Sequence, residues 1–397
     1  MANALTRFGK FVAGGLSARS FQGVTAEEFM GLTRQQRTST TVTEATALRN
    51  SAVWACLRLR ADLISTFPCD VYRKVGDVRV EVPKPQVLVE PGGPRWDYQD
   101  WMYASQFDLD RSGNDLGLVL ERDGSNRPAL IELVALGDWS VVEKADTGEI
   151  KYRVRGKEYT PDQVWHERQY VVAGCPVGLS PVAHAAWVIS EGLSIQQFAQ
   201  QWFSQGAVPS AHLRNTQKTV PPKTALEVKE RFKASVQVGD PFVSGSDWEY
   251  NPLRAEAMGS EWLNAREASL ADIARFFGVP ADLIDAAVSG QSITYANITQ
   301  RNLQFLIMNL GPAVSRREKN LSKLTAKPRY VKLNTNSLLR MDPKTRAETY
   351  KIMIDARIKT NTEVRALEDD KPLTQAQVDE FETIYGPVKA PPVKAVS

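Results

Sequence analysis

The amino-acid sequence predicts an α+β fold. Short runs of alternating apolar residues recur through the first half of the chain, and turn signals such as Asp123-Gly124 and Thr147-Gly148 separate them. Longer segments, in which apolar residues recur at the spacing of one helix face, precede these strand signals and fill the second half of the chain. Strands that are grouped together, with helices before and after them, are typical of the α+β class rather than of alternating βαβ units.

The composition is that of an ordinary soluble globular protein. The chain has 397 residues, 43% of them hydrophobic, and 49 Lys and Arg against 46 Asp and Glu give a formal charge of +3. Its length predicts two or three domains. The near-neutral charge argues against a protein that coats nucleic acid by bulk charge, because phosphate neutralisation needs a clear basic surplus. No apolar run approaches the roughly 20 residues of a membrane helix, so no membrane partner is expected.

The cysteines and the N-terminal segment bear on the compartment. Cys56, Cys69 and Cys175 are unclustered, so neither a disulfide framework nor a zinc site is expected, and a reducing compartment is favoured. The first 15 residues are too short and too interrupted by charge for a signal peptide. Residues 1–44 are predicted to form a flexible arm, with apolar residues at helical spacing near its start.

The first ordered element is predicted to be a helix over residues 50–64. Apolar residues recur there at helical spacing with Arg60 on the same face, and Asn50 or Ser51 is expected to cap the N-terminus. Apolar and polar residues alternate on both sides of Gly76-Asp77 within residues 69–80, which is the signal of a β-hairpin.

A second helix and a group of strands are predicted next. The helix is expected over residues 97–109. The strands that follow it are closely and regularly spaced, which favours an antiparallel meander. They are predicted at residues 116–122, 129–136, 140–144, 150–154 and 164–170.

The second half is predicted to be mainly helical. Ser180-Pro181 has the cap and first-turn residues of a long helix that runs to about residue 203. A helix from about residue 257 to 277 is expected to stop at Gly278-Val279-Pro280. A long helix after residue 292 is expected to bend at Gly311-Pro312 and to end at residue 324. The remaining helices are predicted at 222–237, 344–358, 361–367 and 374–384, extended segments at 209–214, 240–250 and 330–333, and a disordered tail at 387–397.

No motif for catalysis or for a cofactor is found in the sequence. His166, His184 and His212 have no metal-ligand spacing, and each is expected to be structural. The chain has no GxxxxGK[ST] phosphate loop and no GxGxxG after a strand. Gly178-Leu179-Ser180-Pro181 lacks the last glycine of a GxSxG nucleophile elbow, so we interpret it as a helix cap. No cofactor, no metal and no enzymatic activity are therefore expected.

Charge is unevenly distributed in the C-terminal part. Residues 315–359 carry 13 Lys and Arg against 4 Asp and Glu, whereas residues 360–386 carry 2 against 7. Three interpretations stay open: solvated helix faces, copies of one subunit that meet through complementary charge, or a basic face that meets DNA. Aromatic residues are not interleaved with the basic stretch, which argues against a base-stacking platform.

A collinear series of segments between about residue 50 and residue 373 carries a family resemblance. The segments are Ser51–Pro68 with Val71-Tyr72-Arg73, Gly178–Pro181, Phe203–Ser210, Asp272–Ile284, Leu338–Asp342 and Thr360–Arg365. Each segment alone is weak evidence for a family, but all of them in this order make a specific match. Together they resemble the portal proteins of tailed double-stranded-DNA bacteriophages. The most recognisable segment contains the structural family motif Phe277, Gly278, Val279 and Pro280.

The resemblance implies a portal-type subunit with an α/β wing, long stem helices, a small α/β clip and a helical crown. On this basis residues 45–179 and 293–340 would be the wing, 180–206 and 256–279 the stem helices, 207–255 the clip, 280–292 the tunnel loop region, 341–386 the crown and 387–397 a tail.

The resemblance also implies a function in assembly and DNA passage. Such subunits form a ring, usually of twelve, at one capsid vertex of the virion, after assembly in the host cytoplasm. The implied partners are further copies of the chain, double-stranded DNA in the channel, the terminase large subunit, a head-completion adaptor, and the major capsid protein and scaffold.

Two groups of site residues follow from the resemblance. The tunnel loop facing the DNA channel would contain Val288, Ser289, Gly290, Gln291 and Ser292. The last four residues carry no charge and no aromatic ring, which fits weak, sequence-blind contact with DNA. The clip would bind partners through Lys223, Glu227, Asp240, Phe242 and Trp248.

Two other functions are kept as alternatives. An α+β hydrolase with an unrecognised site would need a nucleophile and a base that the sequence does not supply. A basic DNA-binding protein that uses residues 315–359 would bind DNA as an isolated subunit, with strong dependence on salt.

Overall fold

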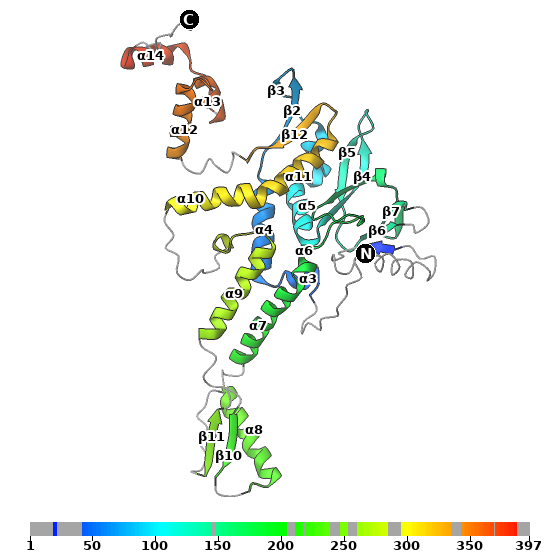
Figure 1. Cartoon of the computed structure of the whole chain (residues 1–397), viewed down its shortest axis with the longest axis vertical. Coiled ribbons are helices and arrows are strands. Elements are labelled where there is room, and N and C mark those ends of the chain that lie inside the picture. The colour runs from blue at the N-terminus through cyan, green and yellow to red at the C-terminus, as the bar shows by residue number, and fades with distance from the viewer. Residues whose placement is uncertain are drawn as a thin grey trace, which may run out of the picture. The chain divides into compact units, whose positions relative to one another are not determined.

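The computed structural model (Figure 1) confirms the α+β class, with helices and antiparallel sheets in one chain. It describes residues 19–21, 42–143, 148–204, 211–216, 219–238, 247–252, 260–284, 295–335, 343–368 and 370–386. The chain divides into two compact units, Met1–Leu333 and Asn334–Ser397. Among the helices that the structure describes, none combines the length and the apolar character needed to cross a membrane.

The described strands of the first unit form four antiparallel sheets. Their orders are β12-β2-β3, β5-β4-β9, β1-β6-β7-β8 and β10-β11. The strands are β1 (Arg19–Phe21), β2 (Cys69–Val75), β3 (Val78–Glu81), β4 (Asn114–Arg122), β5 (Pro128–Leu133), β6 (Trp139–Glu143), β7 (Ile150–Val154), β8 (Lys157–Tyr159), β9 (Val164–Arg168), β10 (Ala211–Asn215), β11 (Trp248–Pro252) and β12 (Arg329–Leu333). Short 3₁₀ turns lie at η1 (Gln86–Leu88), η2 (Gly93–Arg95), η3 (Pro161–Gln163), η4 (Ala281–Ile284) and η6 (Ser322–Leu324).

The predicted meander is wrong in its strand order. β9 does not extend the sheet beside β8, but returns to pair with β4. The physical reason is burial, because Val164 of β9 joins the same apolar cluster as Leu116 and Leu118 of β4. This gain outweighs the tendency of consecutive strands to lie next to each other.

The predicted flexible arm also contains a strand. Residues 19–21 form β1, which pairs with β6 so that Phe21 lies opposite Val141. The pairing gives the edge strand β6 a second hydrogen-bonded neighbour. The apolar run near residue 5 lies outside the described residues.

Two helices form the centre of the first unit. After the short α3 (Glu44–Ala47), α4 (Ser51–Ser65) begins at Asn50, whose side-chain oxygen accepts hydrogen bonds from the N–H groups of residues 52 and 53 at 3.0 and 3.4 Å. The face predicted to be buried is buried, including Arg60. α5 (Tyr98–Ser112) packs on α4 and ends at Gly113, which has a φ of 76° and starts the turn into β4.

The helix predicted from residue 181 to 203 is divided in two. α6 (Pro181–His184) is separated from α7 (Ala186–Ser204) by Ala185, whose ψ of 1° is not helical. Ala185 is fully buried, and the sequence has no Gly or Pro at this position that would mark the interruption. Val182, Ile189 and Leu193 form a buried apolar stripe, whereas Trp187, off this stripe, is 56% exposed.

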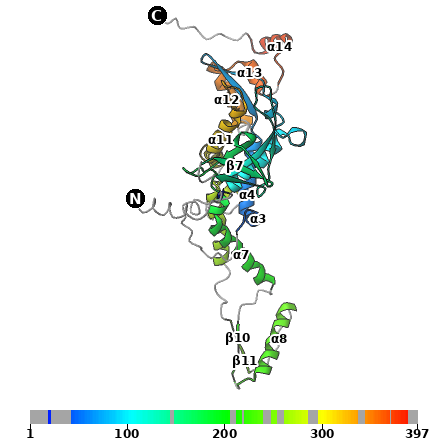
Figure 2. The ribbon, with the colours of Figure 1, turned by 90° about the vertical axis from the view of Figure 1, so that its right-hand side faces the viewer.

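α7 packs against α9 (Ser260–Phe276) through a glycine. A Cβ atom on Gly192 would lie 2.8 Å from Nδ2 of Asn50 and 3.0 Å from Oγ of Ser269. Glycine therefore permits an approach between the two helices that a larger residue would prevent. Between them in the chain, α8 (Pro222–Val238) lies alongside the β10–β11 pair in both views (Figures 1 and 2).

The predicted long helix contains a π-helical segment. α10 (Tyr295–Gln304) continues into η5 (Phe305–Leu310), which has π-helical hydrogen bonding, and then into α11 (Gly311–Leu321). Pro312 has no N–H to donate within a helix. The irregularity predicted at Gly311-Pro312 therefore lies in the turn just before the proline, as a widened turn.

The second unit contains three described helices: α12 (Pro343–Asp355), α13 (Asn361–Leu367) and α14 (Gln375–Tyr385). All three were expected from the sequence within a few residues. α13 and α14 begin with capping boxes at Thr360 and Thr374.

Candidate functional site

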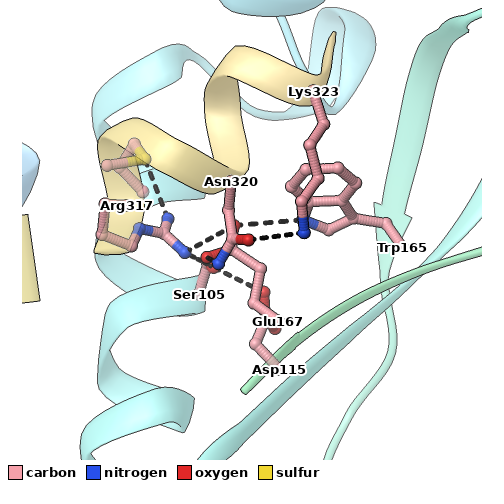
Figure 3. Close-up of polar contacts among 8 residues, drawn as sticks. Ser105, Asp115, Trp165, Glu167, Arg317, Asn320 and Lys323 are labelled. Carbon is pink, nitrogen blue, oxygen red and sulfur yellow. Dashed lines mark hydrogen bonds and ion pairs between the residues drawn. The ribbon is translucent and has the colours of Figure 1, made fainter. Parts of the chain in front are cut away.

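The first notable site is a buried polar cluster that ties α11 to the preceding half of the chain (Figure 3). Arg317 of α11 lies 3.0 Å from Glu167 of β9, and the two side chains are only 2% and 1% exposed. Arg317 also donates a hydrogen bond to Ser105 of α5 at 2.8 Å. Ser105 in turn donates to Asp115 of β4 at 2.5 Å. Arg317 thus links α11 directly to α5 and β9, and Ser105 extends the link to β4.

Further hydrogen bonds fix the position of Glu167. Its Oε1 accepts from the indole N–H of Trp165 at 3.2 Å, and its Oε2 accepts from the amide of Asn320 at 3.0 Å. Lys323 donates to the amide oxygen of Asn320 at 2.7 Å. Both carboxylate oxygens of Glu167 are therefore satisfied, which a buried charge requires.

Asp115 is a second buried carboxyl in this cluster. Burial, with the nearby charge of Asp108 as a further cause, raises the pKa of Asp115 to about 8. The carboxyl is therefore protonated at neutral pH and adds no second negative charge beside Glu167. The cluster is consequently close to electrically balanced, with Arg317 against Glu167.

A second buried cluster joins α4 to α5. Arg60 lies 3.0 Å from Asp110, and Gln106 and Gln169 also donate to this carboxylate, at 3.0 and 3.1 Å. Gln169 additionally donates to the carbonyl of Leu109. Arg60, which the sequence pattern places on the apolar face of the helix, is thus paired with Asp110. The side-chain amides of Gln106 and Gln169 also bind this carboxylate.

The buried ion pair and two of the buried thiols are poorly placed for chemistry on a ligand. Glu167 and Arg317 are enclosed and cannot reach a substrate. Cys56 and Cys69 are buried, and burial raises their thiol pKa values to about 12 and about 11, so neither is a reactive thiolate at neutral pH. Within the same described residues, no group of three His, Cys, Asp or Glu could hold a metal ion.

His166 is a half-buried histidine held between Tyr152 and Asn114. Its Nδ1 lies 3.0 Å from the hydroxyl of Tyr152, and its Nε2 lies 3.3 Å from the side-chain oxygen of Asn114. That oxygen can only accept, so Nε2 carries the proton and Nδ1 accepts from Tyr152. Burial, together with the positive charges of Arg168 and Lys323, lowers the pKa of His166 to about 3.

This pKa predicts a stability loss at acid pH. Below about pH 6.5 the unfolded chain binds a proton at His166, whereas the folded protein does so only near pH 3. Unfolding should therefore become easier by about 1 kcal/mol for each pH unit between these values. Urea unfolding of the protein and of His166→Gln, at several pH values from 7.5 to 4.5, should show a shallower pH slope for the variant. The exposed His184→Gln serves as the control and should keep the original slope; an unchanged slope in His166→Gln would contradict the assignment.

The predicted family motif forms the end of α9. Gly278 has a φ of +63°, as expected for a glycine helix stop, and Val279 N–H donates to the carbonyl of Ala274 at 3.0 Å. Phe277 and Val279 are buried, and Pro280 is half-buried. A Cβ on Gly278 would contact the side chain of Asn309 in η5 at 3.4 Å. The motif therefore brings the end of α9 beside the π-helical segment.

An ion pair links the residues on either side of the predicted tunnel loop. Asp282 of η4 lies 2.8 Å from Arg301 of α10. The loop residues Val288, Ser289, Gly290, Gln291 and Ser292 lie outside the described residues.

The predicted clip residues are only partly described. Lys223 and Glu227 are exposed on α8, and Trp248 is half-buried at the start of β11, opposite Asn215 of β10. Asp240 and Phe242 lie outside the described residues. The structure brings none of the described clip residues into a shared polar contact, and Asn215 instead donates to Asp247 at 2.7 Å.

Part of the basic surplus of residues 315–359 is neutralised within the chain. Arg317 pairs with Glu167, and Arg346 lies 2.9 Å from Glu368, two acids from outside this stretch. This pairing reduces the charge available to DNA and weakens the DNA-binding alternative. The sequence pattern groups Arg317 with the basic stretch, although it stands between apolar residues at helical spacing, as Arg60 does.

Comparisons with known proteins agree with the fold. A family model described as phage portal protein matches residues 51–369. The chain is 28% identical over 359 residues to the probable portal protein of Streptomyces phage phiC31, covering 84% of this chain and 77% of that protein. It is 25% identical over 360 residues to the portal protein of Enterobacteria phage HK97, covering 86% and 83%.

Solved structures show the same likeness. An HK97 family phage portal protein from Corynebacterium diphtheriae matches with a TM-score of 0.58 and 20% identity, over 77% of this chain and 100% of that chain. A chain in the neck of a native gene transfer agent particle, computed with C12 symmetry, matches with a TM-score of 0.56 and 18% identity, over 94% and 100%. At these identities the structures support the fold alone.

Proposed function

Because the chain belongs to the phage portal protein family, we propose that twelve copies form a ring at one capsid vertex, through which double-stranded DNA is packaged and ejected. The family match over residues 51–369 carries the proposal, because it spans the strand-rich and the helical halves of the chain. Portal proteins are structural proteins and not enzymes, and roles in DNA packaging and in docking are general to the family. The C12 symmetry of the similar neck structure supports a ring of twelve.

Contacts in the first unit support a wing built from two distant stretches. In this proposal residues 45–179 and 293–340 form one body. β12 pairs along its length with β2, and Arg317 of α11 pairs with Glu167 of β9. A buried ion pair and a shared sheet are the contacts expected inside a single domain rather than between separate ones.

The packing of α7 on α9 supports their assignment as the stem helices, residues 180–206 and 256–279. Each stem helix of a ring must contact its own partner and also a neighbouring subunit. Gly192 and Ser269 meet within the chain, and the exposed Trp187 lies off the buried stripe. An exposed tryptophan of this kind suits a contact between subunits.

The clip, residues 207–255, is proposed to dock the terminase large subunit and later a head-completion adaptor. Lys223 and Glu227 are exposed on α8 and carry opposite charges one turn apart, so this surface offers polar contacts to a partner. The crown, residues 341–386, would be the helical part of each subunit, and the major capsid protein and scaffold would contact the assembled ring.

The ring is tested by measuring the mass of the purified protein. Size-exclusion chromatography with light scattering should give a mass near twelve times the 44.1 kDa subunit, and negative-stain images should show rings. A monomer or dimer under all conditions would overturn the proposal.

The tunnel loop is tested by a deletion. Removal of Ser289–Ser292 is expected to leave ring assembly intact and to reduce DNA packaged per capsid, because the loop would contact DNA and not another subunit. Replacement of the four residues by Gly-Ser-Gly-Ser keeps length and lack of charge, and should package near normally. If the deletion prevents ring assembly, the loop assignment is wrong.

A further inference from the structure

α14 is a helix whose side chains are almost all exposed. Of residues 375–384, whose burial is described, only Val378 is not exposed. Described side-chain hydrogen bonds of α14 run within the helix, such as Gln375 to Asp379 at 2.9 Å and Thr383 to the carbonyl of Asp379 at 2.7 Å. The helix has only 11 residues. Isolated helices of that length are marginal in water, and most helices are stabilised by packing an apolar face.

The surface of α14 combines apolar and acidic side chains. Phe381 is 48% exposed and Ile384 is 60% exposed, and with Val378 they recur at a spacing of three residues on one side of the helix. Asp379, Glu380 and Glu382 lie among them, and the helix contains no Lys or Arg. A surface that fits α14 should therefore be apolar at its centre and basic around it.

The C-terminal end of α12 and the turn after it have this character. Ile352 is 66% exposed and Ile358 is 70% exposed, which leaves two large aliphatic side chains in water. Lys351 and Arg357 are exposed beside them, against one exposed acid of the same stretch, Asp355. By contrast, the N-terminal half of α12 is engaged within the chain, because Arg346 and Tyr350 contact Glu368 at 2.9 and 2.8 Å.

We propose that α14 of one subunit packs on the C-terminal end of α12 of the next subunit. The inference rests on the proposed ring, because a ring joins copies through two different surfaces, one on each side of the subunit. Ile384 would contact Ile352 and Ile358, and the acidic residues of α14 would face Lys351 and Arg357. The opposite charges at the end of α12 and on α14, both in the second unit, would then serve its assembly. Repeated contacts around the ring would cover Ile384 in every subunit.

Cysteine crosslinking in assembled rings tests this contact. Rings are assembled from a mixture of Ile352→Cys and Ile384→Cys subunits and oxidised. The native Cys56, Cys69 and Cys175 are buried and do not compete. We expect disulfide-linked dimers on non-reducing gels, and a ladder of higher species from the double variant. A mixture of Ala347→Cys, exposed in the N-terminal half of α12, with Ile384→Cys is the matched control and should give far less crosslink.

Charge reversal supplies a second measurement. Lys351→Glu should lower the yield of crosslinked dimer several-fold, and Glu380→Lys together with Glu382→Lys on the other subunit should restore it.

The outcomes separate this contact from the function on which it rests. Intact rings without crosslinks would overturn the contact and leave the ring standing. A fast-migrating monomer from the double variant would mean that α14 folds onto its own α12, and would also overturn it. If added DNA protects the new thiol of the Ile352→Cys variant from a thiol reagent, without crosslinking, the basic surface would belong to DNA and the contact would again be overturned. Failure of the unmodified protein to form rings would overturn the proposed function itself.

Discussion

Arg317→Leu is expected to lower the free energy of unfolding by about 3–5 kcal/mol. Removing one partner of a buried ion pair leaves the other as an uncompensated charge, which is the main source of such a loss. Here Glu167 would keep only the hydrogen bonds from Trp165 and Asn320. Ser105 would lose its donor as well.

Urea unfolding followed by tryptophan fluorescence measures this loss, because Trp101 lies beside the arginine and Trp165 donates to its partner Glu167. Lys319→Leu is the matched control, since Lys319 is exposed on the same helix and should change stability by less than about 0.5 kcal/mol. The double variant Arg317→Leu with Glu167→Leu should lose less than the sum of the single changes, because no charge is left unpaired. Additive losses would argue against the pair.

Gly113→Ala is expected to cost more than about 4 kcal/mol and to prevent folding at about 37 °C. Gly113 has a φ of 76°, and a Cβ atom there would overlap the carbonyl oxygen of Leu179. The obstacle is backbone and not the end of a flexible side chain. Gln169 donates its N–H to the carbonyl of Gly113 at 2.9 Å, and Gly178 is equally crowded by these two residues, so the chain cannot shift away.

Gly156→Ala separates the two causes of the expected loss of stability, which are the left-handed conformation and the overlap with backbone. Gly156 has a φ of 81° and nothing within 4 Å of an added Cβ. It should therefore cost only the strain of a left-handed alanine, about 1–2 kcal/mol. Thermal unfolding and the soluble yield of both variants provide the measurement. Equal losses of stability in the two variants would show that the left-handed backbone conformation alone explains the requirement for glycine at position 113. The overlap with the carbonyl of Leu179 would then contribute nothing.

Local features of the fold could be predicted from the sequence, because neighbouring residues determine them. The face of α4, the hairpin about Gly76-Asp77 and the helix stop at Gly278 all depend on residues a few positions apart. The same spacing placed Arg60 on the buried face. Its partner Asp110 could not be predicted, since it comes from another helix.

Features that depend on distant contacts were missed. The return of β9 to β4 is decided by burial in a shared apolar cluster, which strand spacing does not report. The break at Ala185 has no local signal. Arg317 was counted with the basic stretch, because a single sequence does not show that Glu167 and Ser105 enclose it. The portal resemblance predicted the family, whereas the tunnel loop and the domain boundaries stay predictions.

The pairing of β2 with β12 has a consequence for synthesis on the ribosome. β2 ends at residue 75, but the strand that covers its open side begins at residue 329. At a translation rate of about 5–20 residues per second, that strand emerges on the order of ten seconds later or more. During this interval the nascent chain carries an uncovered strand edge that another nascent copy could pair with. Correct folding of the subunit during synthesis therefore depends on keeping this strand edge unpaired, or shielded by a chaperone, until translation is nearly complete.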